Sequence, residues 1–268
     1  MSDHALDEPL RRARPQPASV PWRRAAWRQY RLERKMFWRN PSAAFFNFLL
    51  PLIFLALFGA IFSEDEENLQ VIVPGIAGMA VMSTTFSALA MTLTYLRESG
   101  VLKRIRGTPL PTSAYLAGIA GNAITNTALQ VTLITAAGSL VFGLDPPQDL
   151  VALVVFVVIG VICFASLGVA LSHALPNFDS APAYVNAAFL PVIFISGVFY
   201  DADYAPGFLQ AIAEALPLKH LIDGLSGALV TGEGLSDNLP ALALLALWSA
   251  AGVVLAVRGF SWEARRGG

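Results

Sequence analysis

Residues 150–171 read LVALVVFVVIGVICFASLGVAL, a run of apolar and small residues without a charged side chain. An α-helix rises about 1.5 Å per residue, so about 20 apolar residues are enough to cross the hydrocarbon layer of a bilayer. Surface helices of soluble domains carry a polar face, which this run lacks. The run therefore predicts a helix that spans a membrane.

Comparable apolar runs lie on both sides of this stretch. Of all residues in the chain, 55% are hydrophobic and only 14% are charged, which is more apolar surface than one soluble domain of 268 residues can bury. The predicted spans are residues 45–62, 71–96, 112–142, 150–171, 183–200 and 240–257. The sequence thus predicts an all-α integral membrane protein whose residues 41–258 form six transmembrane helices.

The segments on either side of this membrane unit differ in character. Residues 1–20 are expected to form a disordered tail, because they cannot bury enough apolar surface to fold, and residues 259–268 a short basic tail. Residues 21–40 mix aromatic rings with cations, which predicts an amphipathic helix in the headgroup layer. Its expected interfacial residues are Trp22, Arg28, Arg31, Arg34 and Trp38. A solvated basic helix that flanks the first span is the alternative.

The distribution of lysine and arginine predicts the orientation in the membrane. Seventeen of the eighteen lie before the first span, between the second and third spans, or after the sixth span, and only Lys219 lies in the alternate loops. Because basic residues are retained on the cytoplasmic side, both termini are predicted to be cytoplasmic. The opposite face is rich in acidic residues, which we interpret as a solvated rim; a vestibule that attracts cations is the alternative.

The sequence between the second and third spans, RESGVLKRIRGTPLP at residues 97–111, is called the basic loop below. Glycines on both sides of residues 101–106 predict a helix of about one and a half turns. Val101 and Ile105 are four residues apart, so this helix would present a small apolar surface, surrounded by cations, to a groove on a soluble partner. The alternative is that these cations only fix the topology and bind lipid phosphates.

Residue patterns that carry chemistry are missing from the sequence. None of the three lysines follows the glycine spacing of a phosphate-binding loop, and neither the three histidines nor the single Cys163 has catalytic or metal-ligand spacing. No ionisable residue lies in the middle of a predicted span, which argues against an ion-coupled carrier. We therefore expect no catalytic residue, metal or cofactor on this chain, and another polypeptide would have to supply energy.

Polar side chains follow one face of the third predicted span. Asn122, Asn126 and Gln130 are spaced by four residues, while Thr84 and Asn186 lie in the second and fifth spans. Such groups avoid hydrocarbon, so they should face protein or a water-filled path. They would make either interhelical hydrogen bonds or contacts with a transported substrate.

Three motifs resemble those of the type-2 ATP-binding-cassette (ABC-2) permeases, especially the daunorubicin-exporter-like branch. They are the basic loop, NFDSAP at 177–182 followed by ISGVFY at 195–200, and LPLKHLIDG at 216–224. In that family the loop after the second span forms a cytoplasmic coupling helix that docks on an ATPase. An outer re-entrant element between the fifth and sixth spans matches the amphipathic residues 208–216. The docking residues that this implies are Arg97, Glu98, Ser99, Gly100, Val101, Leu102, Lys103, Arg104, Ile105 and Arg106.

The resemblance also implies a function and a set of partners. The chain would be the permease subunit of an ATP-driven exporter that moves an amphiphilic drug, lipid or glycolipid across the cytoplasmic (inner) membrane of a prokaryote. Two ATPase subunits would bind ATP and Mg, and a second permease subunit would complete a homodimer or heterodimer within the membrane lipid. Neither enzymatic activity nor a nucleic-acid partner is expected. The alternatives are an ATP-independent secondary carrier and a membrane scaffold or assembly factor.

Overall fold

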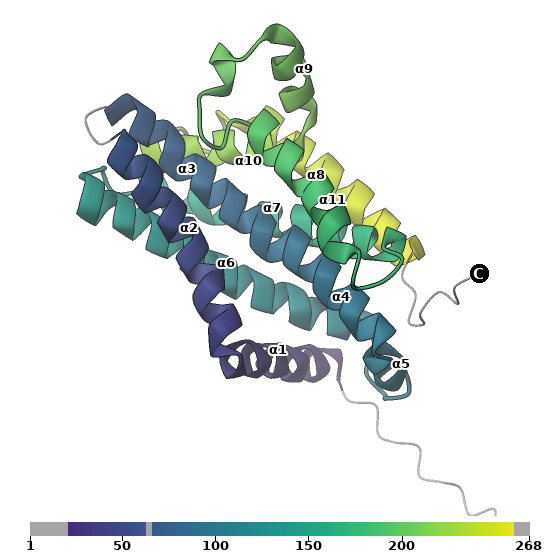
Figure 1. Cartoon of the computed structure of the whole chain (residues 1–268). Coiled ribbons are helices and arrows are strands. Elements are labelled where there is room, and N and C mark those ends of the chain that lie inside the picture. Colours follow the sequence, from purple (N-terminus) through teal and green to yellow (C-terminus); the bar gives the residue numbers. More distant parts are fainter. Residues whose placement is uncertain (1–20, 63–65, 260–268) are drawn as a thin grey trace, which may run out of the picture.

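The computed structural model describes residues 21–62 and 66–259, and every regular element in these two segments is helical (Figure 1). The predicted tails over residues 1–20 and 259–268 lie outside the described residues, apart from Gly259. The α-helices are α1 (Trp22–Arg39), α2 (Pro41–Ile61), α3 (Glu66–Met82), α4 (Ala88–Glu98), α5 (Val101–Arg106), α6 (Thr112–Phe142), α7 (Leu150–Ala174), α8 (Ala181–Ile195), α9 (Gly207–Ala215), α10 (Pro217–Ser226) and α11 (Leu239–Gly259). Shorter elements are π-helical turns at Ser83–Ser87 and Gly227–Thr231 and a 3-10 turn at Ala202–Tyr204.

Five helical segments are long and apolar enough to cross a membrane: α2, the continuous helix that α3 and α4 form, α6, α7 and α11. They match five of the six predicted spans, and the chain is a multi-pass membrane protein. The exception is α8, whose 15 residues extend about 22 Å, less than the about 30 Å of a hydrocarbon layer. The helix predicted over residues 183–200 ends early, because the chain leaves it at Ser196 and turns at Gly197, whose φ is +75°.

The helix that α3 and α4 form lies at the centre of the bundle, where it packs against α6, α7 and α10. At the π-helical turn between its two halves, the hydroxyl of Thr85 donates to the carbonyl of Val81 at 2.6 Å. Gly168 of α7 meets this turn so closely that a Cβ there would lie 2.6 Å from the carbonyl oxygen of Phe86. The absence of a side chain at Gly168 therefore lets the two helices touch at the turn.

The segment between α8 and α11 forms one exposed and one buried helix. α9 stands out from the bundle at the end opposite α1 and α5 (Figure 1), and Phe208 on it is 68% exposed. α10 instead packs among α3, α7 and α11, where Leu218 and Leu221 are fully buried. The element that enters the bundle is therefore α10, one helix later than the expected residues 208–216. Gly160 of α7 explains the difference, because a side chain there would occupy the space of Leu221.

α1 lies across the end of the bundle rather than along it, and α5 lies at the same end (Figure 1). The helix predicted over residues 21–40 is thus present. Asn40 ends α1 and Pro41 begins α2, a position where proline is favourable because the first helical residue needs no N–H donor. The α1–α2 corner places an amphipathic helix directly beside the basic loop.

Candidate functional site

α1 is held closely against the first half of α6. Gly118 of α6 makes this approach possible, because a Cβ at that position would lie 2.5 Å from Cγ of Gln29. The hydroxyls of Tyr30 and Thr125 share a hydrogen bond of 3.2 Å across the same interface. α1 is therefore a fixed part of the bundle and not a loosely attached flanking helix.

Four of the five predicted interfacial residues keep an exposed surface. Trp22 and Trp38 are about half exposed, and the indole of Trp22 also donates to Oγ of Ser113 at 2.9 Å. Arg28 and Arg31 are exposed on the outer side of α1. This arrangement suits rings and cations that meet lipid headgroups, and the interfacial role of these residues stays a prediction.

Arg34, the fifth of these residues, turns toward the protein. Its guanidinium donates to Oδ1 of the buried Asn126 and lies 5.7 Å from the centre of the Trp38 ring. A charged donor on a buried amide oxygen is a strong hydrogen bond. Asn126 therefore fixes α1 on α6. Of the two roles expected for this amide, it makes the interhelical hydrogen bond.

The other predicted amides are placed in three different ways. Gln130 accepts from the hydroxyl of Thr84 at 2.6 Å and donates to the carbonyl of Asn47 at 2.6 Å, so it links α6 to two other helices. Oδ1 of Asn122 is buried and has no hydrogen-bond partner within the described chain. Asn186 is exposed on α8 and does not join the others. Asn126 and Gln130 thus make interhelical hydrogen bonds, whereas Asn122 and Asn186 do not.

A cavity of about 180 Å³, called the α1 cavity below, lies between α1, α2, α4 and α6. Leucines of α4 form much of its apolar wall, together with Phe37 and Ile119. Its polar lining residues are Glu33, Asn47, Thr84, Thr92, Asn122 and Asn126. Pockets for drug-sized ligands usually measure about 300–1,000 Å³, so this cavity fits the polar end of a molecule rather than the whole of a large one.

Glu33 is a residue of this site that the sequence analysis missed. It is the only acidic residue of α1, and its Oε1 accepts a hydrogen bond of 2.7 Å from Nε2 of Gln29. Burial raises the pKa of the Glu33 carboxyl above its ordinary value. Ala25, Gln29, Glu33 and Phe37 are spaced by four residues and share the face of α1 that packs inward, which is the signal that would have revealed it.

The basic loop contains the predicted short helix, α5. Gly100 has a φ of +71°, a left-handed conformation that suits glycine and separates α5 from α4. Leu102 is only 1% exposed, whereas Val101 and Ile105, the apolar pair expected to face a partner, are half-buried, with Ile105 packed against the cluster around Leu102. The exposed side chains of α5 are Lys103, Arg104 and Arg106.

Two of the predicted docking residues instead hold the loop that joins α7 to α8. The buried Arg97 donates to the carbonyl of Leu175 at 3.2 Å. The carboxylate of Glu98 accepts from the backbone N–H of Phe178 at 2.7 Å. The NFDSAP motif and the start of the basic loop are therefore in direct contact. Ser99, between Glu98 and Gly100, is exposed.

A groove of about 250 Å³ separates α1 from the end of the basic loop. Arg28 and Leu32 line it from α1, and Thr108, Pro109 and Leu110 line it from the loop. Arg28, Leu32 and Thr108 are exposed, so the groove is open at the surface. The structure thus brings α1 and the end of the basic loop together at one open groove.

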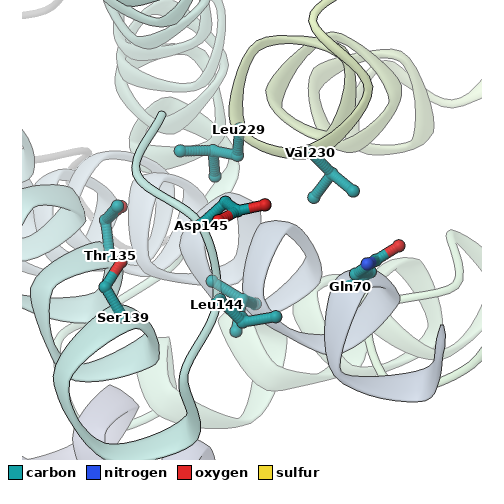
Figure 2. Close-up of a pocket in the computed structure, with 8 residues that line it drawn as sticks. Gln70, Thr135, Ser139, Leu144, Asp145, Leu229 and Val230 are labelled. Carbon is teal, nitrogen blue, oxygen red and sulfur yellow. The ribbon is translucent and has the colours of Figure 1, made fainter. Parts of the chain in front are cut away.

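Two further pockets lie toward the opposite end of the bundle. Figure 2 shows the smaller one, of about 40 Å³, where Asp145 lies between Thr135 on one side and Gln70 on the other. It has room for one or two water molecules. The larger one, of about 470 Å³, has an aromatic lining that includes Phe199 and Tyr204. Neither pocket contains a residue of the predicted transport path.

Comparison with known proteins gives consistent matches. The profile of the ABC-2 type transporter family matches residues 24–230. The chain is 28% identical over 200 residues to the ycf38 protein of Porphyra purpurea, which covers 70% of this chain and 68% of that protein. It is 32% identical over 184 residues to the daunorubicin resistance ABC transporter permease protein DrrB1 of Streptomyces coeruleorubidus, covering 64% and 63%. The inner membrane transport permease YadH of Escherichia coli K12 is 24% identical over 156 residues, covering 58% and 60%.

Proposed function

The chain belongs to the ABC-2 type transporter family, and on this basis we propose that it is the membrane-spanning permease subunit of an ATP-driven exporter. Two separate ATPase subunits would bind ATP and Mg, because this sequence has no phosphate-binding loop. The observation that carries the proposal is the contact between α5 and the wall of the α1 cavity. That contact gives an ATPase at the basic loop a direct route to a site inside the bundle.

The docking surface would consist of the exposed cations of α5 and the groove beside α1. Lys103, Arg104 and Arg106 point away from the bundle core, and the groove between Leu32 and Pro109 offers a recess of about 250 Å³. Exposed ion pairs contribute only about 0.2–1 kcal/mol each, so these cations would set the register of docking more than its affinity. A segment of the ATPase that enters the groove would supply apolar contact.

Movement of α5 would be transmitted through Leu102. This side chain is buried in a cluster with Leu93, Tyr115 and Ile119. Leu93 and Ile119 also line the α1 cavity. Each of these two residues therefore contacts the cluster around Leu102 and also forms part of the cavity wall. Close-packed side chains transmit displacement rather than absorb it. Closure of the ATPase pair would therefore change the shape of the cavity and alternate its access.

A second permease subunit would cover α8. This helix is apolar, yet Tyr184, Asn186 and Phe194 on it are exposed in the single chain. An amide exposed to hydrocarbon lacks hydrogen-bond partners, whereas one at a helix–helix interface finds them. We therefore infer that the segment from α8 to Tyr200 is the sixth crossing and that a neighbouring copy or a related chain covers its exposed face. The alternate distribution of basic residues supports a cytoplasmic position for α1, α5 and both termini in a prokaryotic inner membrane.

The cargo would be amphiphilic, because the α1 cavity combines an apolar wall with a few polar groups. The decisive experiment reconstitutes the full chain in lipid with an ABC ATPase that co-purifies with it and measures ATP-dependent export of a fluorescent amphiphile. Export that requires both ATP and the ATPase would support the proposal. Export driven by an ion gradient without ATP would indicate the secondary carrier, and neither assembly with the ATPase nor export would indicate the scaffold.

A further inference from the structure

We propose that the α1 cavity binds the ammonium head of a cationic amphiphile, with the carboxylate of Glu33 as its counter-charge and Oδ1 of Asn122 as a second acceptor. This inference rests on the proposed function and names the class of cargo and the residues that select it. It concerns a site that lies inside the bundle, away from the docking surface on α5.

The first argument is the placement of a single acid. α1 carries seven basic residues and one acidic residue, Glu33. A carboxylate on such a helix would be expected among the exposed cations, yet Glu33 lines the cavity instead. It makes no ion pair within the described chain, and its hydrogen-bond partner is the neutral Gln29. Glu33 is half-buried, and a partly desolvated carboxylate without a counter-ion is less stable than a solvated one, so a cation in the cavity would stabilise it.

The second argument is the set of acceptors around Glu33. An ammonium group has three donors and no acceptor, so it needs several oxygens close together. Oδ1 of Asn122 lines the same cavity and lacks a partner in the described chain, and the hydroxyl of Thr92 is a further acceptor on the lining. Asn126 is not available in the same way, because its Oδ1 accepts from Arg34. Arg34 is not among the lining residues, but its guanidinium lies at Asn126 on the cavity wall, so a bound cation would be placed toward Glu33 and Asn122 and not toward Asn126.

The third argument is the size and polarity of the walls. About 180 Å³ accommodates a head group, while Leu89, Leu96 and the exposed Met36 give an apolar surface along which a hydrocarbon or aromatic remainder can lie. An anionic head would meet the Glu33 carboxylate and be repelled, and an uncharged head would leave it without a counter-ion. The cavity therefore discriminates by charge at the head and by hydrophobicity beyond it.

The test is a binding measurement on the full-length permease, without ATPase, in nanodiscs of phosphatidylcholine. A fluorescent alkyl amine is compared with the alcohol that has the same chain and fluorophore, and empty nanodiscs supply the background. We expect the amine to bind about tenfold or more tightly than the alcohol. Glu33→Gln should remove this preference by weakening amine binding at least tenfold, and Glu33→Asp should restore part of it.

Two further variants separate charge recognition from general damage. Glu214→Gln makes the same change on the exposed face of α9, at the other end of the molecule, and should keep the preference. Asn122→Leu leaves the carboxylate intact, fills the head site and should reduce amine binding at least fivefold. Thermal melting of each variant identifies any that does not fold.

Binding without ATP keeps this inference separate from the proposed function. Equal binding of amine and alcohol by the unmodified protein would overturn it, and so would a preference that survives in folded Glu33→Gln. Either result would leave ATP-dependent export by the complex untouched. Conversely, an amine preference that depends on Glu33 would stand even if no ATPase assembled with the chain.

Discussion

The carboxylate of Glu98 lies 2.7 Å from the backbone nitrogen of Phe178 and accepts its hydrogen bond. Tyr95, one turn earlier on α4, packs edge-on against the Phe178 ring, with 5.3 Å between the ring centres. Arg97 between them donates to the carbonyl of Leu175. The end of α4 that leads into the basic loop is therefore attached at three points to the loop between α7 and α8, so that α5 and α8 are mechanically linked.

These three contacts predict that Glu98→Ala affects coupling more than stability. The substitution leaves the Phe178 N–H without its acceptor, which should lower stability by only about 1 kcal/mol because the site is partly exposed. Coupling should suffer more: we expect the ATPase to co-purify normally while ATP-driven export falls several-fold. Glu98→Gln, which keeps an acceptor oxygen, is the matched control and should retain export. Equal export by both variants would show that the contact between Glu98 and Phe178 does not transmit movement.

The cations of α5 are predicted to matter for assembly and not for folding. Reversal of charge at Lys103, Arg104 and Arg106 together should reduce co-purification with the ATPase at least tenfold, with little change in melting temperature, because all three are exposed. Leu102→Ala should lower the stability of the folded chain instead, since loss of a fully buried leucine costs about 2–5 kcal/mol. Thermal unfolding in lipid or detergent measures this loss. Undiminished co-purification of the charge-reversed chain would place the ATPase contact elsewhere.

Most of the fold could be predicted from the sequence, because bilayer thickness makes apolar length informative. The end of α8 was missed, because the apolar run at residues 183–200 outweighed Gly197, a residue that favours the end of a helix. Its end depends on Gly75 of α3, where a Cβ would lie 2.1 Å from the carbonyl oxygen of Val198, so the chain turns where another helix leaves room. Such a tertiary contact leaves no local pattern.

The site was predictable only where a pattern of spacing existed. Asn126 and Gln130 were found through their four-residue spacing, and their interhelical hydrogen bonds follow from the need to satisfy amides in a membrane. Glu33 was missed because one acid among seven bases resembles a solvated ion pair. Its role depends on the face that α1 turns toward α6, which Gly118 determines through close packing.

Asn122 and Asn126 are predicted to respond differently to the same substitution. Asn126→Leu removes the acceptor of Arg34 and leaves a guanidinium without its buried partner, so it should destabilise the protein by about 2–4 kcal/mol. Asn122→Leu removes an oxygen that has no partner in the described chain, so stability should change by less than about 1 kcal/mol while the substrate profile shifts. Thermal unfolding and competition between labelled amphiphiles measure the two effects. An unchanged profile for Asn122→Leu would exclude it from the transport path.

The pH dependence of stability gives an independent probe of Glu33. Burial raises the pKa of this carboxyl in the folded protein, so the folded state binds the proton more tightly than the unfolded state does. The resulting stabilisation is fully present below the ordinary carboxyl pKa and is lost as the pH rises through the raised pKa of the folded state.

Glu33→Gln should remove this component, because a glutamine resembles the protonated carboxyl at every pH. The melting temperature of the unmodified protein, relative to that of the variant, should therefore decline as the pH rises from the ordinary carboxyl pKa through the raised pKa of the folded state. Above the raised pKa of Glu33 the variant should be the more stable of the two. Glu214→Gln, at an exposed position, should run parallel to the unmodified protein. A gap between unmodified protein and Glu33→Gln that does not change with pH would mean that the carboxyl is solvated and that the α1 cavity holds no charge for a cation to neutralise.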